Sequence, residues 1–348
     1  MVQPWTATCM QVYTHTVNSA NNREEAMAIV NKSLDRWVTL AKGTARGPGP
    51  YVLLYPEFAL TGFPLLESAE EWIEKACIEI PGPETGKLQK AAQELKCYIG
   101  ANSYEKDPEW PGRYFNCSYL IDPSGDIILK YRRINTVHTA SPHDFMDAYL
   151  DRYGLEGTFP VAKTPLGNIA MMPCGEIMYP EAARMFMFRG AEVLLHPTSD
   201  HGAADKWGWE SAKKVRASEN MMYLISTNAT GQLGTFIPEG QTLGHSKIID
   251  YHGRVLADVG GPGESTVASA TIDVEALRRE RRIPGAGNRL LRQRIEMYRP
   301  LYNQTSFYPP NAFADAPMDS KARIMELQEE ALGKMAEAGV VNLPDSET

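Results

Sequence analysis

The chain has 348 residues, of which 43% are hydrophobic and 22% charged, the ordinary balance of a globular protein. Its formal net charge of −8 argues against nucleic acid or an acidic membrane surface as the main partner. Five cysteines without regular spacing favour a reducing compartment over a disulfide framework. No apolar run approaches the roughly 20 residues that span a bilayer, and residues 1–9 lack a secretory pattern. We therefore expect a cytoplasmic protein.

The first half of the chain alternates predicted strands and helices. The helix over 22–41 has an apolar stripe on one face, and the short buried strand over 51–55 runs into Pro56-Glu57. A Gly-Pro-Gly-Pro run separates the two. The predicted elements, in order, are a strand over 5–13, helix 22–41, strand 51–55, helix 84–95, and strands 97–102, 117–121 and 127–132.

Regular periodicity lapses between Asn135 and Phe159, where polar and aromatic residues alternate without a clear pattern. We expect a long loop without regular structure. Loops of this length are uncommon in compact domains and often line binding sites.

The second half repeats the order of the first. Pro180 suits the first turn of a helix, Glu181 suits its positive start and Gly190 its end. The predicted elements are a strand over 169–172, a helix from Pro180, a strand over 191–195, a helix over 205–219, and strands over 221–227, 246–250, 254–258 and 266–273. Two sheets, each with helices on one outer face, are expected to stack as four layers, α-β-β-α.

The composition changes near residue 286. Four prolines punctuate the following stretch, and a last helix is predicted over 319–338. We therefore expect a main domain over 1–285 and a C-terminal extension over 286–348 that wraps a neighbouring subunit.

Three polar residues follow apolar strands: Glu57, Arg133 and Cys174. Strand ends of a layered fold converge on one rim, where sites tend to lie. A thiol becomes an effective nucleophile when a base takes its proton and a positive charge stabilises the thiolate. Cys174 also lies on a tight turn between a strand and a helix, which exposes a side chain close to backbone N–H groups. These features indicate a catalytic cysteine.

Several short motifs resemble those of the nitrilase superfamily of carbon–nitrogen hydrolases, in order and spacing, over residues 5–310. They are Pro56-Glu57-Phe58, Thr61-Gly62-Phe63-Pro64, Lys130-Tyr131-Arg132-Arg133-Ile134, Cys174-Gly175-Glu176, Tyr179-Pro180-Glu181, Arg189-Gly190-Ala191-Glu192-Val193, His196-Pro197-Thr198, Glu219-Asn220, Asn228-Ala229-Thr230-Gly231 and Gly244-His245-Ser246.

The resemblance implies a four-layer αββα sandwich and a Glu-Lys-Cys triad that works without a metal or an organic cofactor. Glu57 would be the general base, and Cys174 the nucleophile that forms a thioester-type acyl enzyme. The backbone N–H of Gly175 would point to the developing oxyanion. The resemblance also implies a homodimer or a larger homo-oligomer.

The sequence departs from the family at the triad lysine, because Tyr131-Arg132-Arg133 stands where Tyr-Arg-Lys is usual. Arg133 keeps the positive charge, but an arginine cannot readily shuttle a proton. Lys130 lies three positions earlier in a strand and should therefore point to the opposite face. An active hydrolase with a Glu-Arg-Cys triad, altered chemistry and lost activity all remain open.

The family's second glutamate also lacks a counterpart, since no glutamate follows Arg133 until Glu156. His143 or Asp144 is the candidate to line the pocket in its place, and a solvated loop is the alternative. His196 and Thr198 either contact substrate or support their loop. Glu176 either makes a structural hydrogen bond or contacts substrate. No ligand spacing indicates a metal site.

The function predicted from the sequence is hydrolysis of a small amide or carbamoyl-type C–N bond through Cys174. Tyr179-Pro180-Glu181 after the cysteine resembles the amidase-like branches, whereas nitrilases usually carry Cys-Trp-Glu where this chain has Cys-Gly-Glu. A nitrilase acting on a nitrile is the alternative within enzymes. A non-catalytic member that binds a metabolite or partner in the same pocket is the alternative outside them.

Overall fold

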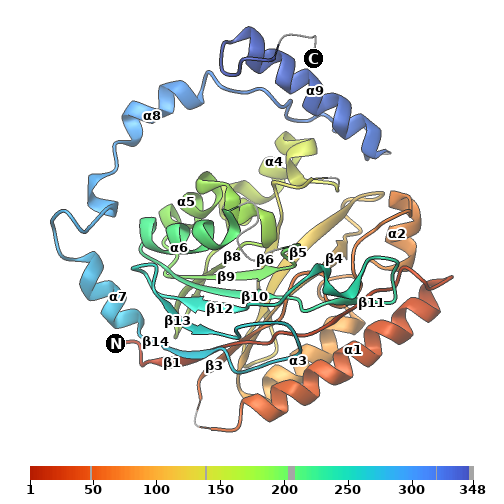
Figure 1. Ribbon diagram of the computed structural model, residues 1–348, viewed down its shortest axis with the longest axis vertical. Coiled ribbons are helices and arrows are strands. Elements are labelled where there is room, and N and C mark those ends of the chain that lie inside the picture. Colours follow the sequence, from red (N-terminus) through yellow and green to blue (C-terminus); the bar gives the residue numbers. More distant parts are fainter. Residues whose placement is uncertain (48, 138, 203–207, 319, 345–348) are drawn as a thin grey trace.

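Two six-stranded sheets stack face to face and helices cover their outer faces, which gives four layers, α-β-β-α (Figure 1). The computed structural model describes residues 1–47, 49–137, 139–202, 208–318 and 320–344. The strands of the first sheet, in spatial order, are β14 (Ser269–Ile272), β1 (Trp5–Cys9), β3 (Tyr51–Leu54), β4 (Tyr98–Lys106), β5 (Tyr114–Ile121) and β6 (Ile127–Arg132). Those of the second are β13 (Val255–Asp258), β12 (Lys247–Ile249), β10 (Tyr223–Asn228), β9 (Val193–Thr198), β8 (Gly167–Met171) and β7 (Ala162–Thr164). A small separate ladder joins β2 (Thr14–His15) to β11 (Gln232–Leu233).

Strand direction explains why residues distant in sequence meet at one edge. In the first sheet β1, β3 and β4 run parallel, and β6 also follows their direction because β5 is antiparallel to both of its neighbours. In the second sheet β8, β9 and β10 run parallel. The carboxyl ends of β3 and β6 therefore lie at one edge of the first sheet, and those of β8 and β9 at one edge of the second.

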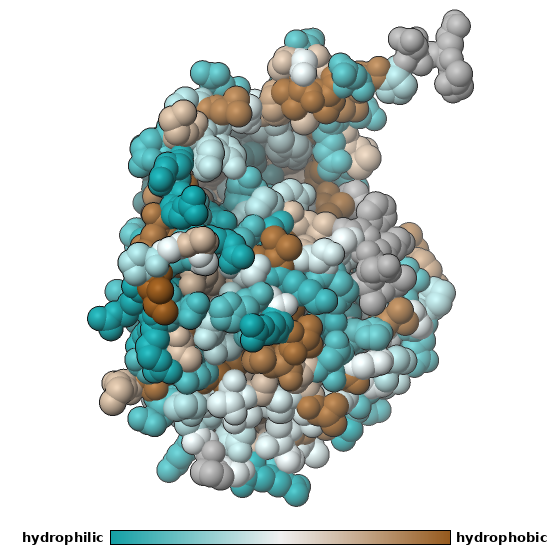
Figure 2. Space-filling view, turned by 60° about the vertical axis from the view of Figure 1, so that its left-hand side comes forward, coloured by the Kyte–Doolittle hydropathy of each residue, from teal (hydrophilic) through white to brown (hydrophobic). Residues whose placement is uncertain are grey.

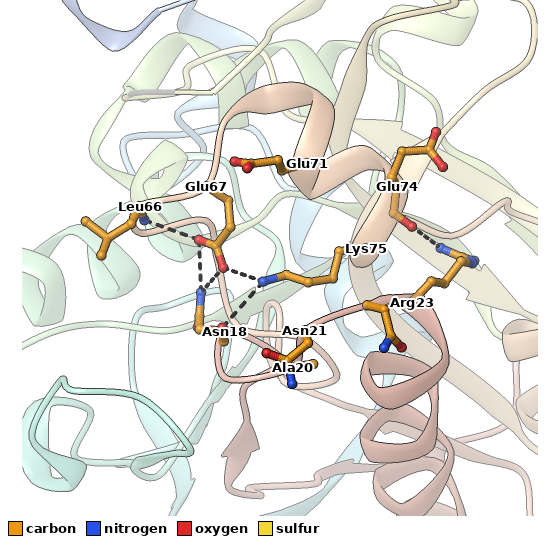
Figure 3. A pocket seen from close by; sticks show the side chains of 10 residues that line it. Asn18, Ala20, Asn21, Arg23, Leu66, Glu67, Glu71, Glu74 and Lys75 are labelled. Carbon is orange, nitrogen blue, oxygen red and sulfur yellow. Dashed lines mark hydrogen bonds and ion pairs between the residues drawn. The ribbon is translucent and has the colours of Figure 1, made fainter.

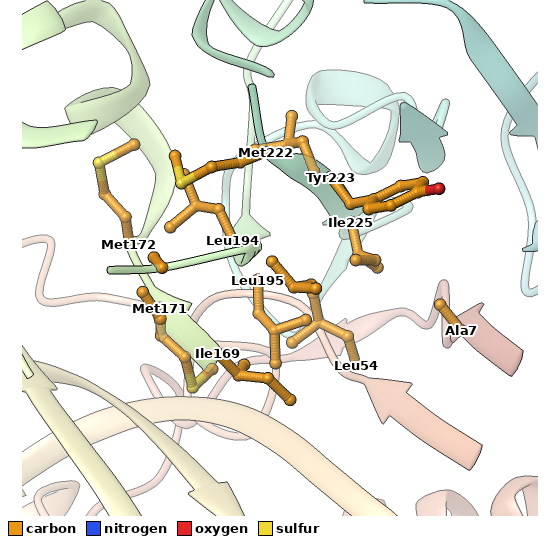
Figure 4. Close-up of a cluster of buried hydrophobic side chains, with 14 of the residues drawn as sticks. Ala7, Leu54, Ile169, Met171, Met172, Leu194, Leu195, Met222, Tyr223 and Ile225 are labelled. Atoms are coloured by element: carbon orange, nitrogen blue, oxygen red, sulfur yellow. The ribbon is translucent and has the colours of Figure 1, made fainter. Parts of the chain in front are cut away.

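The core between the sheets is rich in aliphatic side chains. Ile169 and Met171 from β8 and Leu195 from β9 meet Leu54 from β3, all fully buried (Figure 4). A Cβ at Gly100 would lie 2.8 Å from Leu54 and 3.4 Å from Leu195, so glycine lets the two sheets approach closely at β4. Burial of each such aliphatic side chain contributes about 1.5–3 kcal/mol to stability.

Each helix of the outer layers buries one face against its sheet. On the first sheet lie α1 (Arg23–Thr44) and α3 (Pro83–Leu95), and on the second α5 (Pro180–Phe188) and α6 (Trp209–Glu219) (Figure 1). Asn22 caps α1 by accepting from the backbone N–H of Glu25. Trp37 of α1 stacks on Tyr55 with ring centroids 4.1 Å apart, which fixes the helix against the end of β3.

Most elements expected from the sequence are confirmed within a few residues. The structure adds α2 (Ala69–Lys75), β7 and α7 (Val274–Arg281), which the hydrophobic pattern did not indicate. α2 begins with a capping box, in which Ser68 and Glu71 satisfy each other's backbone N–H groups. Residues 205–207 and 319, expected at the starts of two helices, lie outside the described residues.

The expectation of a structureless loop over 135–159 is wrong. A 3-10 turn, η1 (Pro142–Phe145), leads directly into α4 (Met146–Thr158). Ser141 caps the turn, and Phe145, Tyr149 and Tyr153 recur at every fourth position and pack together beside Phe115 of β5. An aromatic helical stripe was therefore present in a stretch that its polar residues made look irregular.

The C-terminal segment leaves α7 and arches along the side and over the top of the sandwich as α8 (Ile295–Tyr302) and α9 (Lys321–Glu337) (Figure 1). The last helix predicted from the sequence is confirmed, and its side chains Ile324, Leu327 and Ala331 are buried. The backbone N–H groups of Asn311 and Phe313 donate to the carbonyls of His143 and Asp144 and tie the segment to η1. Figure 2 shows a hollow beneath this uppermost part and separate apolar patches on a largely hydrophilic face.

Among the described helices, none combines the length and the apolar character that a membrane crossing requires.

Candidate active site

Four strand ends meet around one buried carboxylate, that of Glu57. Glu57 follows β3 and Arg133 follows β6, while Cys174 and Ser199 follow β8 and β9 of the other sheet. Arg133 Nη1 lies 3.2 Å from Glu57 Oε1. Ser199 Oγ donates to Glu57 Oε2 at 2.7 Å and lies 3.9 Å from Cys174 Sγ. The convergence of Glu57, Arg133 and Cys174 that the sequence predicts is thus present, and Ser199 joins it.

Glu57 is completely buried, and both oxygens of its carboxylate accept hydrogen bonds. Asn116 Nδ2 donates to Oε1 at 2.7 Å, alongside Arg133 Nη1, and Ser199 donates to Oε2. Asn102 holds Asn116 by a 2.6 Å bond between their amides. Burial raises the pKa of Glu57, whereas the charge of Arg133 and the hydrogen bonds from Cys174, Asn116 and Ser199 work in the opposite direction. The carboxylate is therefore fixed in place while its affinity for a proton is increased.

Arg133 joins Glu57 to the turn that carries Cys174. Its Nε donates to the carbonyl of Asn135 at 2.8 Å and its Nη1 to Glu57. A Cβ at Gly175 would lie only 2.8 Å from Nη2, so glycine is required there for the guanidinium to approach the backbone. Although burial works against it, the negative charges of Cys174 and Glu57 hold the pKa of Arg133 above its ordinary value. Arg133 is a permanent cation beside the thiol.

Lys130 takes no part in this cluster. Its Nζ donates to Glu105 at 2.6 Å and to the carbonyl of Ile80 at 2.9 Å. The prediction that Lys130 points to the opposite face of β6 is confirmed, because side chains alternate along a strand.

Cys174 lies on a strained turn. Its φ is +49°, a left-handed conformation that costs a non-glycine residue about 1–3 kcal/mol. The 3-10 turn η2 (Cys174–Met178) starts at this residue and leads into α5 at Pro180. Burial, followed by the negative charge of Glu57, raises the pKa of the thiol to about 12, and Arg133 counteracts only part of this. Free Cys174 is therefore a thiol at neutral pH, and it needs a base at the moment of attack.

His196 supports the turn that carries Cys174 through a hydrogen bond to its backbone. Its Nε2 lies 2.9 Å from the carbonyl of Cys174 and its Nδ1 2.9 Å from Ser226 Oγ. Since a carbonyl only accepts, Nε2 carries the proton and Nδ1 accepts from Ser226. Both ring nitrogens are thus engaged within the protein. The structure gives His196 the loop-supporting contact that was one of its two predicted roles.

A pH effect on stability follows from this arrangement. Burial lowers the pKa of His196 from 6.5 to about 4, so its neutral form is the one that stabilises the fold. That contribution is complete above pH 6.5 and is lost as the pH falls from 6.5 through 4; it amounts to about 3 kcal/mol. Urea unfolding at pH 7 and pH 4 should show this loss of stability. In His196→Asn this pH-dependent loss should be absent. His252→Asn, at an exposed histidine, is the control and should keep it.

Glu176 has a structural role in this structure. It is fully buried and accepts from the Tyr131 hydroxyl at 2.8 Å and from the backbone N–H groups of Ile134 and Asn135 at 3.0 and 2.8 Å. These bonds fix the chain on both sides of Arg133, whose Nε donates to the carbonyl of Asn135. Of the two predicted roles, the structural hydrogen bond is the one that is present.

Thr198 makes its side-chain hydrogen bond within its own loop. Its Oγ1 donates to Asp200, whose carboxylate also accepts from the buried Lys213 Nζ at 2.5 Å. Although burial works against it, the charge of Lys213 lowers the pKa of Asp200. The pair anchors the loop that carries Ser199.

His143 and Asp144 lie on η1, apart from the catalytic cluster. Asp144 Oδ2 accepts from the N–H of Ser141, and the ring of His143 contacts that of Tyr308. Together with Tyr308 and Ile324 of the C-terminal segment they line a cavity of about 440 Å³. Within the described residues, no hydrogen bond joins either side chain to Glu57, Arg133 or Cys174, and their contact with substrate stays a prediction.

Two residues of the cluster, Asn116 and Ser199, were not singled out by the sequence. Asn116 is an amide inside a fully buried strand, β5, and such a group must find a partner. The sequence therefore contained a signal that could have identified Asn116. Ser199 follows His196-Pro197-Thr198 directly, but nothing in the sequence indicates that its hydroxyl faces Glu57 across the two sheets.

A separate cavity of about 590 Å³ lies near the start of α2 (Figure 3). Its carboxylate Glu67 accepts from Lys75 at 2.7 Å and from Asn18 at 3.2 Å. Burial works against ionisation, but the hydrogen bonds from Lys75 and from backbone N–H groups lower the pKa of Glu67 to about 2. Glu67 and Lys75 are paired with each other, and Glu67 accepts from the backbone N–H of Leu65 in the preceding loop. Across the part of the chain that the structure describes, no group of three or more His, Cys, Asp or Glu side chains is arranged to hold a metal ion.

Known proteins share both the sequence pattern and the fold. A formamidase of Bacillus cereus (strain B4264) is 29% identical over 67% of this chain, and the match spans only 65% of that enzyme's length. A formamidase of Bacillus anthracis (strain CDC 684 / NRRL 3495) is 28% identical over the same shares.

Solved structures at 17–19% identity share the fold. The carbon-nitrogen hydrolase of Helicobacter pylori G27 has a TM-score of 0.64, with 86% of this chain and 98% of that one covered. A mutant of the amidase from Nesterenkonia sp. AN1, with the acetamide moiety of fluoroacetamide added covalently at its active-site cysteine, has a TM-score of 0.61 and covers 85% and 96%.

Residues 26–282 match the family described as "Carbon-nitrogen hydrolase". This range contains most of the two sheets and includes Glu57, Arg133 and Cys174. This chain belongs to the carbon-nitrogen hydrolase family.

Proposed function

We propose that this protein hydrolyses the C–N bond of a small, non-peptide amide through an acyl enzyme on Cys174. The observation that carries the proposal is the cluster of Cys174, Ser199, Glu57 and Arg133: a thiol within reach of a buried base and a permanent cation. The formamidase relatives support an amide over a nitrile.

Acylation begins when Glu57 receives the proton of the Cys174 thiol as Sγ attacks the carbonyl carbon. The C=O electron pair moves onto oxygen, and the resulting oxyanion is stabilised by the N–H of Gly175 and by Arg133. Gly175 is the second residue of η2, where backbone N–H groups have no acceptor within the turn. The C–N bond then breaks, and the leaving nitrogen takes the proton from Glu57 and departs as ammonia or an amine.

Deacylation repeats these roles with water. Glu57 removes a proton from the water molecule as its oxygen attacks the thioester carbon, and Gly175 and Arg133 stabilise the second oxyanion. The C–S bond breaks, the carboxylic acid leaves, and the proton returns to Cys174. Arg133 acts throughout by its charge, since its guanidinium does not release a proton at these pH values.

Ammonia release and intact-protein mass spectrometry test the proposal. We expect the wild-type protein to release ammonia from formamide or another short amide in a panel that also contains nitriles. Brief exposure followed by denaturation should show a mass adduct, which Cys174→Ala abolishes. If neither ammonia nor an adduct forms with any amide or nitrile, the protein is not a hydrolase of this class.

We also propose that residues 1–285 form the hydrolase domain and that the extension over 286–348 contacts a second copy of the chain. α8 has no buried residue, and its apolar side chains Met297, Tyr298 and Leu301 are 76%, 52% and 65% exposed. A second subunit would remove this surface from water. Light scattering at micromolar concentration should give a dimer or a larger assembly, and a monomer would contradict this proposal.

A further inference from the structure

The cavity between η1 and the C-terminal segment is built from chain that follows two catalytic residues, Arg133 and Cys174. Its wall includes Asn135, whose carbonyl accepts from Arg133 Nε at 2.8 Å. It also includes Tyr179, which ends the turn that starts at Cys174. The volume of about 440 Å³ falls within the range of small-molecule sites. The cavity is therefore placed to hold a part of the substrate that lies away from the reacting carbonyl.

Asp144 gives this cavity an acidic group with an unused oxygen. The residue is only 7% exposed, and its Oδ2 accepts from the backbone N–H of Ser141 at 2.8 Å. Among the described residues, no donor binds Oδ1 and no cation forms an ion pair with the carboxylate. Arg113 donates instead to the carbonyl of Phe313 at 2.7 Å. A buried carboxylate is costly unless it is paired, so Asp144 is ready to bind a cation.

The ionisation of Asp144 agrees with the lack of a cationic partner. Burial raises its pKa to about 6, and the hydrogen bond from Ser141 and the charge of Arg113 offset only part of this rise. At pH 8 the group is nevertheless a carboxylate. It therefore carries a negative charge in the cavity.

The other walls of the cavity favour a cation over an anion. Of the described residues that line it, none is a lysine or an arginine. Two tyrosines, Tyr179 and Tyr308, lie in the wall, and the ring of Tyr308 is 5.9 Å from that of His143. Burial lowers the pKa of His143, so its ring is predominantly neutral at pH 8. Aromatic faces attract ammonium groups, and a carboxylate beside them adds a charged acceptor.

We propose that this cavity binds an ammonium group of the substrate, paired with Asp144, and that the protein prefers amides that carry such a group at the end away from the scissile bond. This inference deepens the proposed amide hydrolysis and rests on it. Asp144 acts in binding, and the bonds made and broken at Cys174 are unchanged. Because Tyr308 and Gln328 belong to the C-terminal segment, that segment contributes to the choice of substrate.

Matched pairs of substrates test this preference in the wild-type protein at pH 8. We compare 3-aminopropanamide, 4-aminobutanamide and 5-aminopentanamide with butanamide, pentanamide and hexanamide, which have the same numbers of heavy atoms but no charge. For the best pair, kcat/KM should be about 10–100-fold higher with the ammonium group, mainly through a lower KM, as a hydrogen bond to a charged group provides.

Ratios below about tenfold in all three pairs, less than a charged hydrogen bond supplies, would overturn the ammonium site and leave the hydrolase function standing. A protein that yields neither ammonia nor an adduct with any amide or nitrile would overturn both proposals.

Asp144→Asn tests whether the carboxylate binds the ammonium group. Asparagine keeps an oxygen that can accept from the N–H of Ser141, but it has no charge, so the preference ratio should fall by about tenfold or more. Asp147→Asn is the matched control, because Asp147 is an exposed aspartate of α4 outside the cavity wall and should keep the ratio. An unchanged ratio in folded Asp144→Asn, or an equal fall in both variants, would overturn the assignment.

Gln328→Lys provides a second test that leaves the cap of η1 intact. Gln328 is an exposed residue of α9 that lines the cavity, and a lysine there adds a positive charge to the wall. The preference for ammonium-bearing amides should fall in this variant, and an unchanged preference would contradict the proposal. Melting curves show whether each variant is folded, and Gln328→Lys decides the question if Asp144→Asn is not.

Discussion

Glu57→Gln is expected to lower the rate of ammonia release by about 10³–10⁴-fold, the upper part of the range for general acid–base catalysis. Glutamine has the same shape, and its amide oxygen can still accept from Asn116 and Arg133. It has no basic oxygen to receive the proton of the Cys174 thiol. Because burial raises the pKa of the Cys174 thiol to about 12, loss of the base leaves almost no thiolate at neutral pH. Stopped assays of the acyl adduct follow acylation, and assays of the released carboxylic acid follow deacylation.

The substitution also removes a buried negative charge beside Arg133, so its effect on stability must be measured separately. Thermal melting shows whether the variant is folded at the assay temperature. Glu67→Gln is the matched control, because Glu67 is a partly buried, lysine-paired carboxylate in the separate cavity near α2. If folded Glu57→Gln keeps activity within about tenfold of the wild type, a smaller loss than general base catalysis supplies, then Glu57 is not the base.

Arg133→Ala is expected to lower kcat by about 10²–10³-fold, as does loss of one donor to an oxyanion. It removes the cation beside Cys174 and leaves Glu57 buried without its ion pair, which should cost about 3–5 kcal/mol of stability. Urea unfolding followed by activity measurement on the folded protein distinguishes the two effects. Full activity in a folded Arg133→Ala protein would mean that another group stabilises the oxyanion.

Arg133→Lys tests whether charge alone is sufficient. A lysine can pair with Glu57, but its single ammonium does not reproduce the fork that contacts Glu57, the Asn135 carbonyl and the edge of Gly175 together. We expect activity between those of the wild type and Arg133→Ala. Lys130→Ala is the control: Lys130 belongs to the Glu105 pair on the other face of β6, so kcat should not change.

Local patterns accounted for most of the fold. Period-two and period-3.6 hydrophobic patterns placed the main strands and helices, and strand alternation alone placed Lys130 on the face opposite Arg133. The same reasoning failed over 142–158, where the helix is marked by Phe145, Tyr149 and Tyr153. Those aromatics pack against β5 and the neighbouring loop, so the helix is stabilised by tertiary contacts rather than by a simple apolar stripe.

The sequence by itself determined the two-sheet sandwich, the strand-end positions of Glu57, Arg133 and Cys174, and the cysteine's turn, because these depend on periodicity and on residues close together in the chain. Only the tertiary structure decided which polar groups surround the carboxylate. Asn116 is 59 residues from Glu57 and Ser199 is 142 residues away, on the opposite sheet. The bond from Asn116 depends on the order of the strands within the first sheet, and the bond from Ser199 depends on how the two sheets stack. No pattern along one strand encodes either of these.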